Sequence, residues 1–170
     1  MKRFVLLTLA AVAAGSAAAA ATPEAASAAL WRGLSHAPGV AADTDALERL
    51  FHPDSVVIGA RYRGEAPTLS IGKGRDFIAG LRQAHPTGFY ECEVAREVKR
   101  QDRFATVYSV VESRTDPAAA KADFVGVNSI QLYRSEESWK IVSLYYHVGK
   151  PEVPVPLDGG RSGACLGDRA

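Results

Sequence analysis

The sequence has few of the residues that carry metal or nucleophile chemistry. It contains two cysteines and four histidines, and the histidines lie far apart, without a metal-binding spacing such as H-E-x-x-H. No nucleophile elbow is present, and "GKG" at residues 72–74 lacks the rest of a phosphate-binding loop. We therefore expect no metal site and no cofactor. Hydride transfer, phosphoryl transfer and zinc chemistry have no support in the sequence.

A strong charge of either sign is also absent. The chain has 20 Lys and Arg against 19 Asp and Glu, which gives a formal net charge of +1. Without Lys2 and Arg3 at the amino terminus, the remainder of the chain carries a net charge of −1. A nearly neutral protein has no electrostatic footprint for nucleic acid or for an anionic membrane surface. We therefore expect neither as a partner.

Only one long apolar run is present, and it lies at the amino terminus. Lys2 and Arg3 precede apolar residues 4–12, and small residues follow. This is the layout of a secretory signal peptide with an Ala-x-Ala type cleavage site at or shortly before Ala21. An uncleaved anchor is the alternative, but a membrane-spanning helix needs about 20 apolar residues. We predict a leader over residues 1–21 and an extracytoplasmic protein, periplasmic or secreted.

The remaining residues fit one domain and a tail, since domains typically contain about 100–150 residues. Residues 151–170 are rich in Pro and Gly and predict an extended arm or a disordered tail. Residues 22–150 contain the predicted elements: helices over 23–36, 44–51 and 75–84, strands over 56–63, 89–98, 104–113, 124–133 and 139–147, and a loop over 63–74. Helices followed by antiparallel strands predict an α+β domain with the helices on one sheet face.

The predicted hairpin over residues 124–147 is apolar on both faces. An exposed apolar face of that size usually marks an interaction surface, and a second copy of the chain is its simplest partner. We therefore predict a homodimer through the outer sheet face. A slip of one residue in the hairpin would exchange the two faces. The sequence leaves open whether Trp139, Ile141 and Tyr145 line the interior or the outer face.

The predicted strand over residues 89–98 alternates strictly. Glu91, Glu93 and Glu97 fall on one face, and Tyr90, Cys92, Val94 and Val98 fall on the other. An oxidising compartment would permit a disulfide between Cys92 and Cys165, but a small buried residue is the plainer interpretation of Cys92. The sequence does not decide between these two states.

Three segments together carry a family resemblance. The chain resembles the nuclear-transport-factor-2-like superfamily in its order of elements and in three segments. These are "LERLFHPDSVVIG" with its "LFHPD" helix exit, "GKGRDFIAGLR" and the final "WKIVSLYY". Within it, the SnoaL-like and ketosteroid-isomerase-like small proteins are the most similar, over residues 30–156. The resemblance implies a cystatin-like cone, in which a curved antiparallel sheet wraps around about three helices and encloses an apolar pocket. It also implies a dimer through the outer sheet face.

Chemistry in such a pocket needs a carboxylate, tyrosine or histidine within an apolar cavity. Desolvation raises the pKa of a carboxyl, which can then act as a general base or as a neutral hydrogen-bond donor. The candidate catalytic residues are Asp123 and Glu112. The candidate ligand-binding residues are Tyr62, Tyr108, Asn128, Tyr146 and His147. All have plainer interpretations, because strand-end carboxylates are mostly solvated and tyrosines often serve as amphipathic core residues. Asn128 needs a reason in an apolar strand and could satisfy a local backbone bulge instead of a ligand, and His147 at the end of a strand could be structural.

Three functions remain open at this point. The favoured one is an exported domain that binds a small apolar molecule or acts as an accessory dimer module. The alternative is an isomerase, cyclase or dehydratase that uses a pocket carboxylate as general base. The isomerase pattern is incomplete, since residues 56–60 contain no acid and the first helix offers Trp31 and His36 where an interior tyrosine is needed. The third is a structural dimer whose own side chains fill the pocket.

Overall fold

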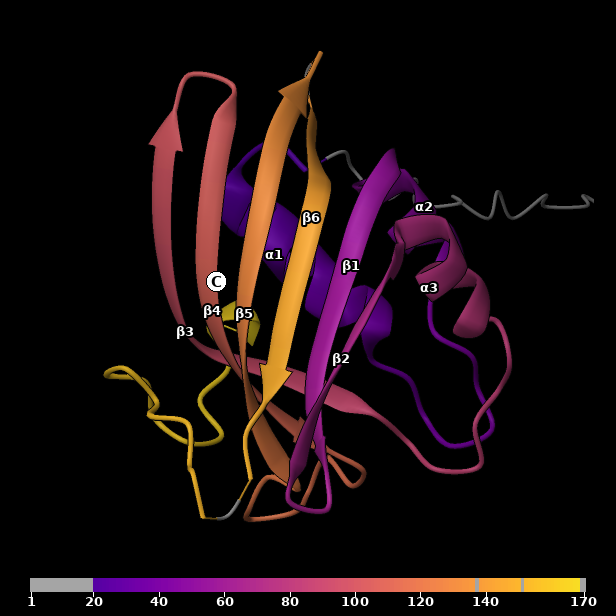
Figure 1. Cartoon of the computed structure of the whole chain (residues 1–170), viewed down its shortest axis with the longest axis vertical. Coiled ribbons are helices and arrows are strands. Elements are labelled where there is room, and N and C mark those ends of the chain that lie inside the picture. Colours follow the sequence, from indigo (N-terminus) through magenta and orange to yellow (C-terminus); the bar gives the residue numbers. More distant parts are fainter. Residues whose placement is uncertain (1–19, 137, 151, 169–170) are drawn as a thin grey trace, which may run out of the picture.

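The structure is a computed structural model that describes residues 20–136, 138–150 and 152–168 (Figure 1). The predicted leader lies outside these residues except for Ala20 and Ala21. The helices are α1 (Pro23–Leu34), α2 (Thr44–Leu50), α3 (Gly74–Gly80) and a short 3₁₀ helix, η1 (Leu166–Asp168). The strands are β1 (Phe51–Arg63), β2 (Ala66–Lys73), β3 (Tyr90–Gln101), β4 (Phe104–Arg114), β5 (Phe124–Ser135) and β6 (Ser138–Val148).

All six strands form one sheet in the order β2-β1-β6-β5-β4-β3. Helix α1 crosses one face of this sheet, while α2 and α3 lie beside β1 (Figure 1). The predicted α+β class is therefore confirmed. The sheet is not wholly antiparallel, because β1 pairs with β6 in parallel. The chain crosses from β2 through α3 to the far edge at β3, so β1 and β6 meet in the middle of the sheet.

Side-chain caps start the first two helices. The Thr22 hydroxyl accepts the Ala25 N–H (3.1 Å), and the Asp43 carboxylate accepts the Ala46 N–H (2.9 Å). Both helices end slightly before the predicted residue, because Ser35 and Phe51 already have extended backbone. Within the described residues, no helix is long and apolar enough to cross a membrane.

Strand β2 occupies a segment that the sequence predicts as a loop. It lies at the sheet edge and is mostly exposed, with Leu69 and Ile71 exposed by 57% and 69%. Pro67 and Gly72 fit an edge strand, but both residue types are depleted from strands in general. The prediction was wrong here because an edge strand with both faces near water needs no apolar alternation.

A bulge in β6 decides the register that the sequence left open. Gln131 pairs with Ser143 while Leu132 pairs with Ile141, so Val142 is an extra residue in β6. The alternation therefore changes phase at Val142. Trp139, Ile141 and Leu144 all lie buried on the inner face, and Tyr145 lies on the outer face with 43% exposure. Part of the apparent two-sided apolar character of this strand comes from the bulge.

A second bulge changes the faces of β3. Between Glu93 and Ala95 the pairing with β4 shifts by one residue. Before the bulge, Glu93 is buried on the inner face; after it, Val98 packs into the main core and Glu97 is exposed. The predicted face containing all three glutamates is therefore wrong. The bulge separates Glu97 from Glu91 and Glu93.

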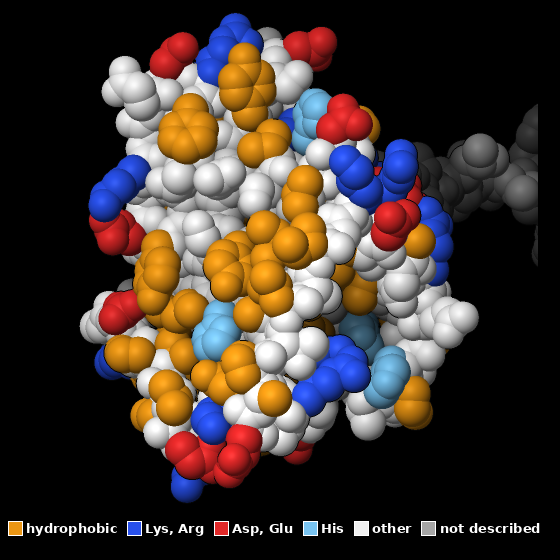
Figure 2. Space-filling view, viewed as in Figure 1, with side chains coloured by type: hydrophobic (Ala, Val, Ile, Leu, Met, Phe, Trp, Pro, Cys, Tyr) orange, Lys and Arg blue, Asp and Glu red, His pale blue; other side chains and the backbone are white. Residues whose placement is uncertain are grey.

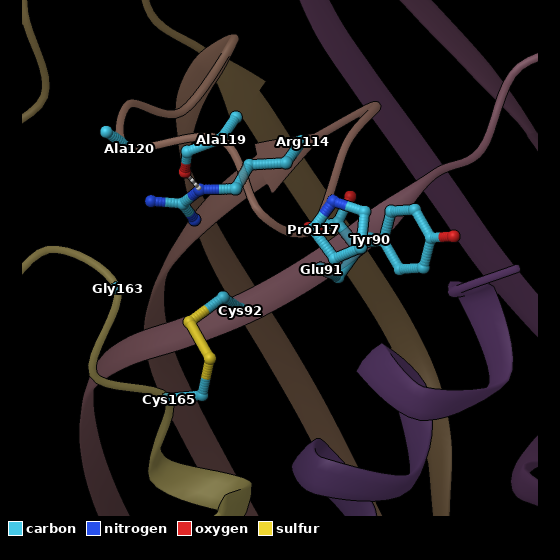
Figure 3. A pocket seen from close by; sticks show the side chains of 9 residues that line it. All are labelled: Tyr90, Glu91, Cys92, Arg114, Pro117, Ala119, Ala120, Gly163 and Cys165. Carbon is cyan, nitrogen blue, oxygen red and sulfur yellow. Dashed lines mark hydrogen bonds between the residues drawn. A yellow bond between two sulfur atoms is a disulfide. The ribbon is translucent and has the colours of Figure 1, made fainter. Parts of the chain in front are cut away.

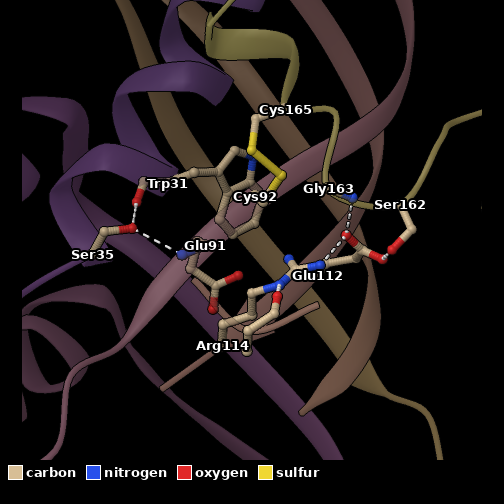
Figure 4. The surroundings of a disulfide bond; sticks show 10 residues. Trp31, Ser35, Glu91, Cys92, Glu112, Arg114, Ser162, Gly163 and Cys165 are labelled. Atoms are coloured by element: carbon tan, nitrogen blue, oxygen red, sulfur yellow. Dashed lines mark hydrogen bonds and ion pairs between the residues drawn. A yellow bond between two sulfur atoms is a disulfide. The ribbon is translucent and has the colours of Figure 1, made fainter. Parts of the chain in front are cut away.

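The carboxy-terminal tail covers part of the outer sheet face. Cys92, Val94 and Val110 form a small second core, and Val155, Leu157 and Cys165 of the tail pack against it. A disulfide joins Cys92 to Cys165 across 73 residues of sequence (Figure 4). The described part of the tail is thus packed on the sheet. It supplies some of the cover that the sequence assigns to a second copy of the chain.

Glu112 holds this tail in place. It is buried, and its carboxylate accepts hydrogen bonds from the Ser162 hydroxyl (2.5 Å), the Gly163 N–H (2.7 Å) and the Arg114 guanidinium (2.9 Å; Figure 4). Burial alone would raise the pKa of Glu112, but these hydrogen bonds outweigh it and hold the pKa below its usual value. An ionised Glu112 therefore stabilises the packed tail.

The rest of the outer face exposes apolar side chains. Hydrophobic groups gather over the middle of this face in Figure 2. The strand register places Tyr108, Ser129, Tyr145, Ile58 and Ile71 in one row across five strands. Tyr108, Tyr145 and Ile71 are all exposed. The homodimer through the outer face remains a prediction, now confined to this uncovered region.

Candidate functional site

A cavity of about 380 Å³ lies between the helices and the inner sheet face. This volume falls within the range of about 300–1,000 Å³ that is typical of small-molecule sites. The walls come from α1, the end of α3, and every strand except β2. Their apolar side chains are Trp31, Leu34, Phe77, Leu81, Phe89, Val111, Phe124, Leu144 and Val148.

Glu91 is the acidic residue of this cavity. It lies at the start of β3, directly opposite Ser113 of β4, whose hydroxyl donates to both carboxylate oxygens (3.1 and 3.2 Å). The Glu91 N–H donates to the Ser35 hydroxyl oxygen (2.9 Å), and the Ser35 hydroxyl donates to the Trp31 carbonyl (2.7 Å). These contacts tie β3 to α1 and fix where the carboxyl lies.

Burial raises the pKa of Glu91 to about 8, and the Ser113 hydrogen bond offsets only part of this effect. Among the described residues, no cationic side chain forms an ion pair with Glu91. The carboxyl is therefore mainly neutral at pH 7. In that state it can donate a hydrogen bond to a polar atom inside the cavity.

Asn128 of β5 is the second polar group of the interior. Its side chain is buried, and its amide nitrogen donates a long hydrogen bond to the Ser109 carbonyl (3.4 Å). The neighbouring Tyr146 of β6 also lines the cavity. A Cβ atom at Gly59 would lie only 2.2 Å from the Tyr146 hydroxyl oxygen, so glycine at this position lets the ring lie across β1.

Glu93 fixes the wall behind Glu91. Its buried carboxylate accepts hydrogen bonds from the hydroxyls of Ser27 (2.8 Å) and Ser109 (2.7 Å) and from the Arg96 guanidinium (3.0 Å). The Trp31 indole N–H in turn donates to the Ser27 hydroxyl oxygen (3.1 Å). This network orients the Trp31 ring, which forms part of the cavity wall.

Glu91 also lines two smaller hollows outside the cavity. One, of about 310 Å³, includes Tyr90, Arg114 and the disulfide (Figure 3). The other, of about 370 Å³, lies between α1 and the tail. Cys165 lines both hollows. The edge strand β3 therefore has Glu91 next to the candidate cavity and to these two hollows.

The structure divides the residues predicted from the sequence. Asn128, Tyr146 and His147 line the cavity. The His147 ring lies edge-on to Tyr62 at a centroid distance of 5.8 Å. Tyr62 lines a separate hollow beside Lys150. The cavity therefore collects three of the five predicted ligand-binding residues.

Neither predicted catalytic carboxylate lines the cavity. Glu112 lies under the tail, on the sheet face opposite the helices. Asp123 is exposed, and its carboxylate accepts the Thr115 N–H (2.6 Å) within the loop before β5. Tyr108 is exposed on the outer face near Asp158; partial burial and the Asp158 carboxylate raise its pKa.

Glu91 is the functional candidate that sequence reasoning missed. It falls in the alternating "YECEV" stretch, where its face reads as the solvated side of a strand. The available signal was Cys92: if its side chain meets the tail on the outer face, its neighbour Glu91 must point inward. In the part of the chain that the structure describes, no cluster of three His, Cys, Asp or Glu side chains could hold a metal ion.

Comparisons with known proteins place the fold. No protein-family model and no curated protein matches the chain. A solved nuclear-transport-factor-2-like protein from Silicibacter pomeroyi matches with a TM-score of 0.51 and 22% identity, over 74% of this chain and 92% of that chain. A candidate ketosteroid isomerase from Parabacteroides distasonis matches with a TM-score of 0.50 and 17% identity, over 76% and 89% of the two chains.

A third solved structure, a protein with a cystatin-like fold from Nostoc punctiforme, matches with a TM-score of 0.50 and 16% identity, over 66% and 80% of the two chains. Identities this low establish a shared architecture and no shared chemistry. The chain therefore has the nuclear-transport-factor-2-like fold, as its resemblance to that superfamily implied.

Proposed function

We propose that this protein binds a small, mainly apolar molecule in the cavity between the helices and the sheet. The observation that carries the proposal is Glu91, a carboxyl with a raised pKa in an apolar wall and with no ion-pair partner among the described residues. A neutral carboxyl there donates a hydrogen bond to a carbonyl or hydroxyl oxygen of the ligand. Asn128 offers a second polar contact, since its amide makes one long hydrogen bond to the protein.

The apolar walls supply most of the affinity in this proposal. Burial of apolar surface contributes roughly 25 cal/mol per Å². The aromatic side chains Trp31, Phe77, Phe89 and Phe124 surround the volume and offer flat surfaces to a ring or chain. The Glu93 network holds Trp31 in its orientation before any ligand arrives, which lowers the entropy cost of binding.

Binding of a neutral apolar ligand is expected to weaken as the pH rises through about 8. Below this pH the Glu91 carboxyl is neutral; above it, the ligand must displace water from a carboxylate. We expect the Kd of N-phenyl-1-naphthylamine, a neutral fluorescent probe, to rise about tenfold between pH 6.5 and pH 9.5. A rise of this size means that the bound probe raises the pKa of Glu91 by roughly one further unit. Fluorescence titration measures both values.

Two variants locate this pH dependence. Glu91→Gln is expected to bind the probe at both pH values about as tightly as the unmodified protein does at pH 6.5. Asp123→Asn, which removes a carboxylate outside the cavity, should retain the full pH dependence. If the probe does not bind, or binds with the same pH dependence in Glu91→Gln, the proposed site is wrong.

Acid–base catalysis on a bound ketone is a second candidate function. The observation that favours it is the same pKa of about 8, because a group that titrates near the working pH can both accept and donate protons. In this candidate the Glu91 carboxylate removes a proton from the carbon next to the carbonyl and returns it two carbons further along. The composition of the substrate is unchanged.

Conversion of a β,γ-unsaturated cyclic ketone to its conjugated isomer tests the second candidate. The rate should rise with pH and level off above about 8, because the ionised carboxylate is the active form. Glu91→Gln should lower it by about 100-fold or more. Ultraviolet absorbance of the conjugated product follows the reaction. Probe binding without any Glu91-dependent conversion would leave binding as the function.

The predicted extracytoplasmic location is retained as part of the proposal. The disulfide between Cys92 and Cys165 supports it, because structural disulfides form and persist mainly in oxidising compartments. Export would also place the apolar cavity where small molecules enter the cell envelope or its surroundings. Sequencing of the mature amino terminus tests the predicted cleavage.

A further inference from the structure

We propose that the ligand of this cavity is an amphipathic organic monoanion, whose anionic group lies at Arg61 while its apolar body lies against the aromatic walls. This inference rests on the proposed binding function and adds the chemical class of the ligand. Its basis is the position of Arg61, the lack of an ion pair to Arg61 within the described residues, and the distribution of charge around the cavity.

The alternation of β1 directs Arg61 toward the cavity. Val57, Gly59 and Arg61 share one face of the strand. Val57 is buried in the main core, and Gly59 lies against the Tyr146 ring inside the cavity. Arg61, two residues further on, lines the cavity at the end where the residue is exposed to solvent. The guanidinium therefore belongs to the mouth of the site.

Arg61 also has no acidic partner in the part of the chain that the structure describes. Within the described ranges Arg61 forms no ion pair. Glu152 lines the hollow beside Tyr62 and Lys150, and its carboxylate oxygen lies 3.9 Å from the Lys150 ammonium nitrogen. An arginine guanidinium presents its N–H donors in a planar fork that matches a carboxylate or a sulfonate. One available guanidinium at an apolar opening suits a ligand with a single negative charge.

The two charged residues of the cavity come from distant strands. Arg61 is on β1 and Glu91 is on β3, and three strands lie between them in the sheet. Of the described residues that line the cavity, Arg61 is the one arginine or lysine and Glu91 the one acidic residue; His147 is a further titratable residue. With Glu91 protonated, Arg61 gives the mouth of the cavity a positive charge. An anionic group at Arg61 neutralises this charge, and a polar atom at the other end of the ligand reaches Glu91.

A matched pair of probes tests the ligand class at pH 7. N-phenyl-1-naphthylamine and 1-anilinonaphthalene-8-sulfonate share the same aromatic body, but only the second carries an anionic group. Arg61→Gln is expected to raise the Kd of the sulfonate about fivefold or more. The reason is that the variant loses a charge-assisted contact between the guanidinium and the sulfonate in a partly exposed site. The Kd of the neutral probe should change by less than about twofold.

Two controls make the result specific. Arg63→Gln removes the same charge from the same strand outside the cavity lining, and it should leave both affinities unchanged. Leu81→Trp narrows the cavity and should weaken both probes. Displacement of each probe by the other shows that they share the site.

Each result has a defined meaning. If both probes bind but Arg61→Gln affects them equally, or if they do not compete, the monoanion is overturned while apolar binding stands. If the neutral probe fails to bind, the proposed function fails, and this inference fails with it. A selective loss of sulfonate binding in Arg61→Gln alone supports the inference.

Discussion

Reduction of the Cys92–Cys165 disulfide is expected to lower the free energy of unfolding by about 4 kcal/mol. The bond closes a loop of 73 residues, and loss of the loop-closure constraint in the unfolded chain gives this order of magnitude. The folded state also depends on the bond, because Val155 and Leu157 pack against the second core only while the tail lies on the sheet. Urea unfolding with and without dithiothreitol, followed by circular dichroism, measures the difference.

A double variant provides the control for this effect. Cys92→Ala combined with Cys165→Ala should unfold at the urea concentration of the reduced protein, and dithiothreitol should not shift it further. Glu112→Gln should weaken the hold on the tail without removing the bond, with a smaller loss of about 1–3 kcal/mol. Equal stability of the oxidised and reduced protein would show that the tail does not depend on the disulfide.

Replacement of Glu91 by glutamine is expected to raise the free energy of unfolding by about 3 kcal/mol at pH 7.5. The pKa of Glu91 is about 8 in the folded protein against an ordinary value of 4.5. Between these pH values the folded state holds a proton that the unfolded chain has released, so stability falls as the pH rises. Each unit of pH in this window costs about 1.4 kcal/mol. Glutamine has no such cost.

The pH dependence separates this gain from a general packing effect. At pH 4, below the unfolded pKa, Glu91→Gln should be about as stable as the unmodified protein, and the difference should grow up to about pH 8. Glu97→Gln, on the exposed side of the same strand, should show no such trend. Urea unfolding at several pH values provides the comparison. A constant difference at every pH would contradict the raised pKa.

A gain in stability on loss of Glu91 would also bear on function. Groups that destabilise the fold are commonly retained where a site needs them. The combination of higher stability with a lost pH dependence of probe binding would identify Glu91 as a functional group. Higher stability with unchanged binding would leave it as a buried carboxyl without a role in the cavity.

The general architecture was predictable because it follows from local patterns. The cap at Asp43, the apolar spacing of Leu47 and Leu50, and the order of helices and strands all identify elements before their packing is known. Together they specify an α+β domain with helices on one sheet face. The same patterns indicate that an asparagine in an apolar strand needs a reason, and Asn128 lies in the cavity wall.

The sheet face that each side chain occupies was less predictable, because one extra residue in a strand reverses the faces of all residues after it. The sequence around Val94 and Val142 contains no pattern that predicts a bulge. Each bulge moves the residues that follow it to the other face of the sheet. Glu91 was missed for a related reason: a glutamate in an alternating strand normally faces water. Its inward direction could be inferred only from the side on which Cys92 meets Cys165, and that pairing joins segments 73 residues apart.

In the proposed binding function, the position of Glu91 on an edge strand lets ligand and proton reach it from different directions. A molecule that fills the main cavity covers Glu91 from one direction, while the two smaller hollows beside β3 remain open to water. Protons can therefore reach or leave this residue while the ligand stays in place. In the proposed function, a rise in external pH therefore deprotonates Glu91 while the ligand is still bound, and release does not require the ligand to leave first.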